Sequence, residues 1–157
     1  QIKWLTYPSR QELPLLAESA QATLKDIGMD VDINCTADNN SVVQDPAAWD
    51  VYAMANVQAP TGDPEYWFTV FATSDATKNQ GAYKNEKLDQ LEEQLSQEFD
   101  TDKRAKLAVQ MQQTVLDDNA FVYCSFLKMS QISRANVTGY MAHACDYYQV
   151  TADLDIN

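Results

Sequence analysis

The sequence has few of the residues from which most enzyme and metal sites are built. It contains one histidine, His143, and four glycines, and no G-x-G or G-K-[ST] phosphate loop occurs in it. A single histidine excludes a paired-histidine metal site and a relay of two histidines. The three cysteines, Cys35, Cys124 and Cys145, have no C-x-x-C spacing and match no common metal or redox motif. The composition therefore gives little support to an enzyme.

Basic residues are scarce as well. Eleven lysines and arginines stand against 23 acidic residues, which gives a formal net charge of −12. Nucleic acids and anionic membranes need basic patches, so we expect neither as a partner, although acidity also simply aids solubility. No run of about 18 apolar residues occurs, so no membrane span is predicted. The chain opens without Met or a signal peptide, and we expect it to be an excised or processed part of a longer protein.

The residues that are present predict one α/β domain over residues 1–157, without repeats or a linker. Residues 2–7 are β-branched and aromatic, as in a strand, and residues 29–34 alternate apolar and acidic, as in a half-buried strand. Between them a helical stripe begins near Gln11, where Ser9 and Glu12 resemble a capping box, and ends at Gly28. This order predicts a βαβ unit with parallel strands.

Further along, residues 37–48 are polar and predict a loop with one short helical turn. Residues 49–57 are apolar on both faces, which predicts a central strand. Two helices are predicted next. The first is capped by Asn85 and has Phe99 on its inward face, and the second is capped by Thr101 and has Ala105 on its inward face. The short loop between them predicts an antiparallel hairpin. Residues 120–129 predict a buried strand and residues 147–150 a short one. We therefore expect Cys35 and Cys124 to be reduced and buried on strands, and Cys145 to be more accessible.

The stretch "APTGDPEYWF", residues 59–68, combines a rigid turn with a cluster of aromatic residues. Pro60, Gly62 and Pro64 restrict the backbone, and large aromatic side chains follow at once. In an open α/β sheet, ligands bind beyond the carboxyl ends of the strands, which is where this turn is predicted to lie. The stretch therefore predicts a ligand-facing corner. The alternative is that Trp67 and Phe68 are core residues of a helix that starts after Pro64.

Two other classes of protein remain open on this reasoning. A small α/β hydrolase would use His143 as its base and would need a nucleophile within hydrogen-bond reach. A protein-interaction module would show an exposed apolar patch on the helical hairpin instead of a lined crevice.

Three stretches, in this order, resemble one known family: "YPSRQELPLLAESAQATLKDIGMDVDI", "WDVYAMANVQAPTGDPEYWF" and "GAYKNEKLDQLEEQLSQEFDTDKRAKLAVQMQQTVLDDNAFVYCSF". They are similar to the second, C-terminal lobe of family 5 extracellular solute-binding proteins, the peptide- and nickel-binding receptors of ABC importers. The resemblance implies a single α/β lobe of the type II periplasmic-binding-protein fold, a mixed sheet flanked by helices. The closing "NVTGYMAHACDYYQVTADLDI" looks more like the nickel-type branch.

The resemblance also implies a site and a mode of action. In the family, ligand is trapped in a cleft between two lobes and delivered to the membrane permease, without catalysis or a cofactor. The missing first lobe would supply the other half of the cleft. The receptor would be extracellular or periplasmic and anchored as a lipoprotein. The residues matching the cleft-facing region are Asn56, Gln58, Thr61, Gly62, Asp63, Tyr66 and Trp67.

Two features of that region bear on the ligand. Asp63 matches the acidic residue that meets the peptide amino terminus in peptide-binding members. Gly62 replaces the aromatic residue that is commoner there, which weakens the case for peptides. His143 could supply an imidazole to nickel, which alone would bind weakly without a chelator. The expected ligand is nickel or a nickel chelate ahead of short peptides.

Overall fold

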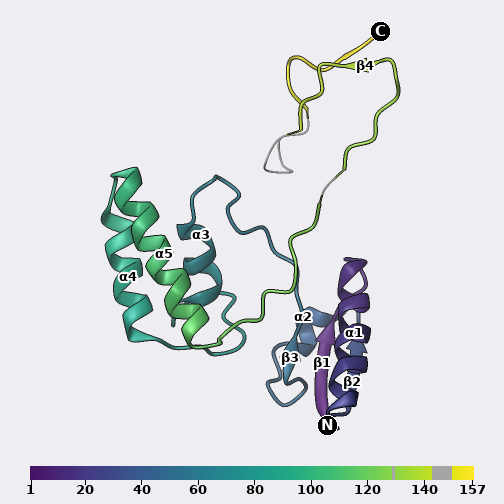
Figure 1. Cartoon of the computed structure of the whole chain (residues 1–157), viewed down its shortest axis with the longest axis vertical. Coiled ribbons are helices and arrows are strands. Elements are labelled where there is room, and N and C mark those ends of the chain that lie inside the picture. The colour runs from purple at the N-terminus through teal and green to yellow at the C-terminus, as the bar shows by residue number, and fades with distance from the viewer. Residues whose placement is uncertain (129, 143–149) are drawn as a thin grey trace. The chain divides into compact units, whose positions relative to one another are not determined.

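The computed structural model describes residues 1–128, 130–142 and 150–157. The chain divides into two compact units, Gln1–Val57 and Gln58–Asn157 (Figure 1). Within the described ranges, none of the helices combines the length and the apolar character that crossing a membrane requires. The assignment of residues 1–157 to a single lobe stays a prediction.

The first unit is built on a βαβ element, as the sequence predicts. Strand β1 (Ile2–Thr6) pairs in parallel with β2 (Val31–Cys35), in a register that joins Ile2 to Val31 and Thr6 to Cys35. Helix α1 (Glu12–Asp26) connects the two strands and lies alongside them (Figure 1). Its apolar stripe buries Leu13 and Ala17, and the sheet contributes Leu5, which is fully buried.

The two ends of α1 differ in how well the sequence predicts them. At the C-terminal end Gly28 adopts a positive φ of 82° and donates its N–H to the carbonyl of Lys25 at 2.9 Å, the expected glycine stop. At the N-terminal end the helix starts where expected. The predicted Ser9–Glu12 capping box is wrong, however, because the N-cap is Gln11 and no side chain caps the helix.

The prediction of a central strand over residues 49–57 is wrong. Strand β3 covers only Val51–Tyr52 and lies at the edge of a three-stranded sheet of order β2-β1-β3. The chain then stays attached to β1 through single hydrogen bonds: the Ala53 N–H donates to the Leu5 carbonyl at 2.9 Å, and the Thr6 hydroxyl donates to the Ala53 carbonyl at 3.2 Å. With a partner on one side only, the segment is half-buried rather than buried. Helix α2 (Asn39–Val42) confirms the expected short turn.

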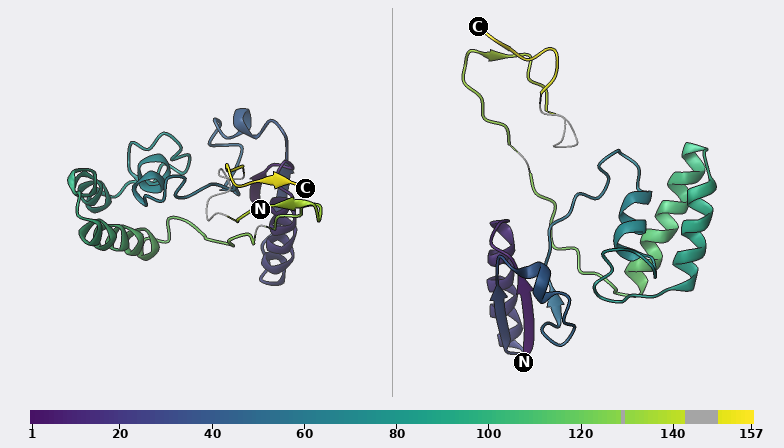
Figure 2. Two further views of the ribbon diagram at one scale, coloured as in Figure 1. Left: turned by 90° about the horizontal axis from the view of Figure 1, so that it is seen from above. Right: turned by 180° about the vertical axis from the view of Figure 1, so that it is seen from behind.

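The second unit has a helical core. Helix α3 (Glu65–Trp67) continues into a π-helical turn, η1 (Phe68–Ala72), and α4 (Glu86–Gln97) and α5 (Thr101–Asp117) form the predicted hairpin. The two long helices lie side by side in every view (Figure 2). Their facing apolar residues and η1 share one core: Phe68, Ala72, Leu88, Leu91, Leu95, Ala108, Met111 and Val115.

The caps of the two helices and two predicted inward residues can be compared with the structure. The Asn85 side chain caps α4 as predicted, accepting the Leu88 N–H at 3.0 Å. Asp100, not Thr101, caps α5, accepting the Lys103 N–H at 3.0 Å. Because α4 ends at Gln97, Phe99 leaves the helical stripe and is 91% exposed, so its predicted inward position is wrong. Ala105 is likewise exposed rather than inward.

The predicted buried strand over residues 120–129 is also wrong for the part that is described. Residues 120–128 form no strand, and Val122 and Phe126 are 88% and 78% exposed. A strand is stable only when its backbone groups are paired, and no described segment pairs with this one. The two-residue strands β4 (Val137–Thr138) and β5 (Asp155–Ile156), which pair antiparallel, were missed. Most of the strand predicted over residues 147–150 lies outside the described residues.

The cysteines give a first testable consequence. Cys35 lies on β2 as predicted and Cys124 lies in the unpaired segment, but both are free and exposed, so their predicted burial is wrong. Cys145 lies outside the described residues. In the 157-residue chain carrying Cys145→Ser, we expect both remaining thiols to react rapidly with a disulfide reagent without denaturant. A further Cys35→Ser change should halve the fast amplitude, and a slow reaction of either thiol would contradict the structure.

Candidate functional site

The predicted corner is a tight turn that leads directly into a helix. The Gly62 N–H donates to the Ala59 carbonyl at 3.0 Å, and Gly62 has a φ of 82°. A Cβ at this position would meet nothing within 4 Å, so it is the left-handed backbone and not a close approach that favours glycine. Asp63 then accepts the Glu65 N–H at 2.9 Å and α3 begins. The expected turn and the helix after Pro64 are therefore both present.

Arg104 on α5 holds this corner to the helical hairpin. Its Nη2 atom donates to both carboxylate oxygens of Asp63, at 2.9 and 2.8 Å, and to Glu65 Oε2 at 2.7 Å. Its Nη1 atom donates to the carbonyls of Leu95 and Glu98 at the end of α4, at 2.6 and 2.8 Å. The Arg104 side chain is only 18% exposed. One guanidinium thus joins the corner, α3 and the C-terminal end of α4.

The ion pairs shift the ionisation of the corner. Burial alone would raise the pKa of Asp63, but hydrogen bonds from the Glu65 N–H and from Arg104 outweigh it and hold that pKa below its ordinary value. Hydrogen bonds to Glu65 and Asp63 in turn raise the pKa of Arg104. The guanidinium also faces the negative end of the α4 dipole, which is a favourable position for a cation. Asp63 is therefore charged, and its charge is compensated from within the chain.

Trp67 packs into an aromatic cluster rather than standing alone. Its ring lies 5.3 Å from that of Phe68 and 5.2 Å from that of Phe121, both edge to face, and 5.9 Å from that of Tyr123. It is half-buried, whereas Phe68 is 1% exposed. The alternative that places Trp67 and Phe68 in a helical core thus agrees with the packing, fully for Phe68 and partly for Trp67.

The remaining predicted residues have exposed side chains or backbone. Gln58, Thr61 and Gly62 are exposed, and Tyr66 is 37% exposed. These lie with Asp63 and Trp67 in the second unit, and the exposed Asn56 lies in the first. His143 lies outside the described residues. Nothing in the described part of the chain gathers three or more histidine, cysteine or acidic side chains around a possible metal ion.

Sequence reasoning missed Arg104 and Glu65 as parts of this corner. A signal for Arg104 was present, because it precedes Ala108, Met111 and Val115 by four, seven and eleven residues and so shares the buried face of α5. An arginine on an apolar face must find acceptors, and an acid-rich chain offers carboxylates. Which carboxylate Arg104 would bind could not be predicted, because Asp63 lies 41 positions away in the sequence.

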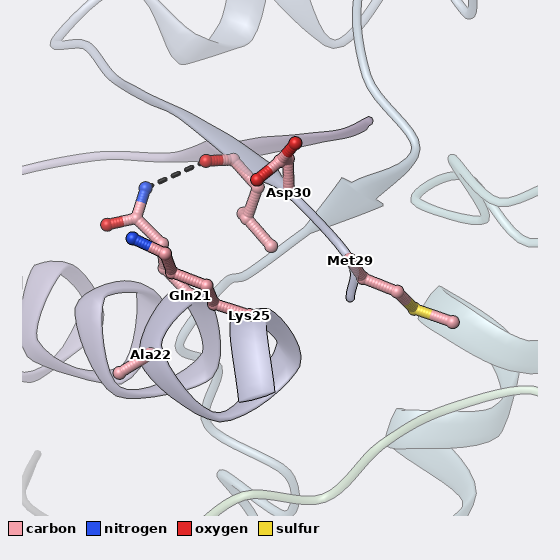
Figure 3. A pocket seen from close by; sticks show the side chains of 6 residues that line it. Gln21, Ala22, Lys25, Met29 and Asp30 are labelled. Carbon is pink, nitrogen blue, oxygen red and sulfur yellow. Dashed lines mark hydrogen bonds between the residues drawn. The ribbon is translucent and has the colours of Figure 1, made fainter. Parts of the chain in front are cut away.

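A separate hollow lies on the first unit, between α1 and the start of β2. Figure 3 shows its lining side chains, among them Gln21, Lys25 and Asp30, with the Gln21 amide donating to the Val31 carbonyl at 2.7 Å. It contains none of the predicted site residues.

Comparison with known proteins decides the family. No protein-family model matches the chain. The nickel-binding protein NikA of Staphylococcus aureus is 31% identical to it over 107 residues, 68% of the chain. The chain belongs to the family 5 extracellular solute-binding proteins. It spans 22% of the length of that relative, which fits a single lobe.

Solved structures of solute-binding proteins confirm the α/β fold class and the type II binding-protein fold. NikA of Staphylococcus aureus in complex with Ni(L-His)2 matches 99% of the chain and 34% of its own, with a TM-score of 0.81 at 24% identity. A nickel ABC transporter protein of Bacillus halodurans matches 74% of the chain and 24% of its own, with a TM-score of 0.68 at 29% identity. The oligopeptide-binding protein AppA of Bacillus subtilis, in complex with a nonapeptide, has a TM-score of 0.59 at 22% identity, over 74% of the chain and 24% of its own.

Proposed function

We propose that this chain is the ligand-binding second lobe of the substrate-binding component of an ABC importer, and that its ligand is nickel held by a small chelator. The similarity to the nickel-binding protein NikA over 107 residues carries the proposal. In this role the chain binds and releases its ligand without catalysis. The protein delivers the ligand to a membrane permease, is extracellular or periplasmic, and is anchored as a lipoprotein.

The corner supplies part of one wall of the ligand cleft. The exposed side chains of Gln58, Thr61 and Tyr66 offer amide, hydroxyl and phenol groups, and the left-handed Gly62 leaves its backbone uncovered. Asp63 connects the corner to Arg104, and Trp67 connects it to the aromatic cluster. Asn56 stays a separate prediction for the first unit. A corner fixed in this way loses little further freedom when ligand arrives.

A chelated metal suits this sequence better than a bare ion. Nickel favours nitrogen ligands such as imidazole, and the chain contains a single histidine, His143. One imidazole leaves most coordination positions of the metal to donors from outside this chain, and a small chelator is the source that we propose. The NikA structure holds such a complex, with two L-histidine molecules on nickel.

Short peptides are the second candidate ligand, and the similarity to the AppA fold supports them. A peptide amino terminus would need an available carboxylate at the corner. Asp63 has both oxygens bonded to Arg104, at 2.9 and 2.8 Å, so an added ammonium group would have to share the carboxylate with the guanidinium. The comparisons support neither a hydrolase using His143 nor an interaction module on the hairpin.

Calorimetric titration of the full-length protein tests the proposal. The probes are Ni²⁺ alone, Ni²⁺ with two equivalents of L-histidine, and a mixture of tripeptides to nonapeptides. We expect micromolar or tighter binding of the nickel–histidine complex, weaker binding of Ni²⁺ alone and no heat with peptides. Tight peptide binding that is lost in Asp63→Asn would reverse the order of ligands, and binding of no probe would overturn the proposal.

A further inference from the structure

The geometry points to Arg104 as the positioning residue of the ligand corner, with Asp63 as its internal counter-ion and not a ligand contact. The inference rests on the proposed function, because it assigns a role within the same corner. It departs from the role that the family resemblance gives to Asp63.

Arg104 bonds to five acceptor atoms from two segments that are far from each other in the sequence. Asp63 and Glu65 belong to the corner and the start of α3, and the carbonyls of Leu95 and Glu98 belong to the end of α4. The planar, rigid fork of arginine suits several acceptors at once, whereas a lysine ammonium acts as a point charge. These bonds connect the corner to the hairpin, and a rotation of the Arg104 side chain would break them.

Asp63 transmits that position to the turn. Its carboxylate accepts the Glu65 N–H at 2.9 Å in addition to the Arg104 bonds, which joins the turn to the first residue of α3. Without Arg104, the carboxylates of Asp63 and Glu65 would face each other uncompensated, and like charges repel. Loss of the guanidinium should therefore make the turn more mobile, in addition to removing the contacts that Arg104 makes.

Lys103 provides a matched control on the same helix. It precedes Arg104, carries the same charge and pairs with Glu98 at 3.7 Å, but its side chain is 66% exposed and it touches no residue of the corner in the described contacts. Solvent-exposed ion pairs of this kind contribute little to the stability of the fold. Lys103→Gln therefore removes one positive charge from the same helical turn without releasing the corner.

The test is amide hydrogen exchange at residues 59–65 of the free full-length protein. Arg104→Gln should speed exchange there about tenfold, and Lys103→Gln should leave it within about twofold. Asp63→Asn should also speed it, and the double variant should exchange no faster than Arg104→Gln alone, because the two residues act through one contact. Exchange at Leu88, Leu91 and Leu95, in the core of the same unit, monitors the fold.

The outcomes separate the alternatives. Additive effects of Asp63→Asn and Arg104→Gln, or exchange unchanged in both, would overturn the inference. A loss of nickel–histidine affinity in Asp63→Asn with unchanged exchange would make Asp63 a ligand contact and would also overturn it. If Arg104→Gln does not fold, Asp63→Asn carries the test, because it keeps the bonds from Arg104 to α4. Failure of the wild type to bind any probe would overturn the proposed function and leave the exchange result standing.

Discussion

Replacing Phe68 by alanine is expected to lower the free energy of unfolding by about 3 to 5 kcal/mol, the range for truncating a buried aromatic side chain. Phe68 is 1% exposed and lies in the core that η1 shares with the hairpin. The deletion removes the ring and leaves a cavity, because Leu88, Leu95 and Met111 are held in place by α4 and α5 and cannot fill it. Urea unfolding of the 157-residue chain, monitored by circular dichroism, measures the change.

Phe99 is the matched control for this prediction. It is the same residue type, but it is 91% exposed in the loop between α4 and α5. Phe99→Ala should change the free energy of unfolding by no more than about 0.5 kcal/mol, as is usual for an exposed position. Equal losses in the two variants would contradict both the boundary of α4 and the assignment of the core.

Trp67→Ala is expected to lower the free energy of unfolding by about 3 kcal/mol, the low end of the range, because the ring is half-buried. The edge-to-face contacts with Phe68 and Phe121 are lost along with the buried area. Ligand affinity per folded molecule should change little, since the proposed wall presents Gln58, Thr61 and Tyr66. Calorimetry on the full-length variant, corrected for the folded fraction, gives the second quantity.

The opposite pattern has a definite meaning for Trp67. A stability close to that of the wild type, with affinity reduced about tenfold, which is about 1.4 kcal/mol of binding energy, would place the ring on the cleft wall. That result would show that the aromatic cluster contributes less than its ring distances indicate.

The sequence was sufficient wherever one local pattern determined the structure. The helical stripe before Gly28 predicts α1, and Asn85 with the leucines that follow it predicts α4. Both predictions succeed because capping and periodicity act within a few residues. The Pro60–Gly62–Pro64 turn was predicted for the same reason, and its left-handed glycine was observed.

The sequence was insufficient wherever the structure of a segment depended on a partner far away in the chain. Residues 49–57 and 120–128 have the composition of buried strands, but pairing on one side leaves the first half-buried, and the second has no partner among the described residues. The role of Asp63 depended on Arg104, 41 positions along the chain, which no local pattern reveals. The candidate ligand residues were named from the family resemblance, and their contacts with ligand stay predictions.

Paramagnetic NMR on the full-length protein tests most directly the claim that the corner forms a wall of a nickel-chelate site. Six-coordinate Ni²⁺ is paramagnetic, and its effect on amide signals falls steeply with distance from the metal. Addition of the nickel–histidine complex should shift or broaden the amide signals of residues 58–66 and affect those near Asp117, at the opposite end of α5 from Arg104, much less. The zinc–histidine complex serves as the diamagnetic control. Tight binding with residues 58–66 unaffected, and other residues broadened instead, would contradict the account.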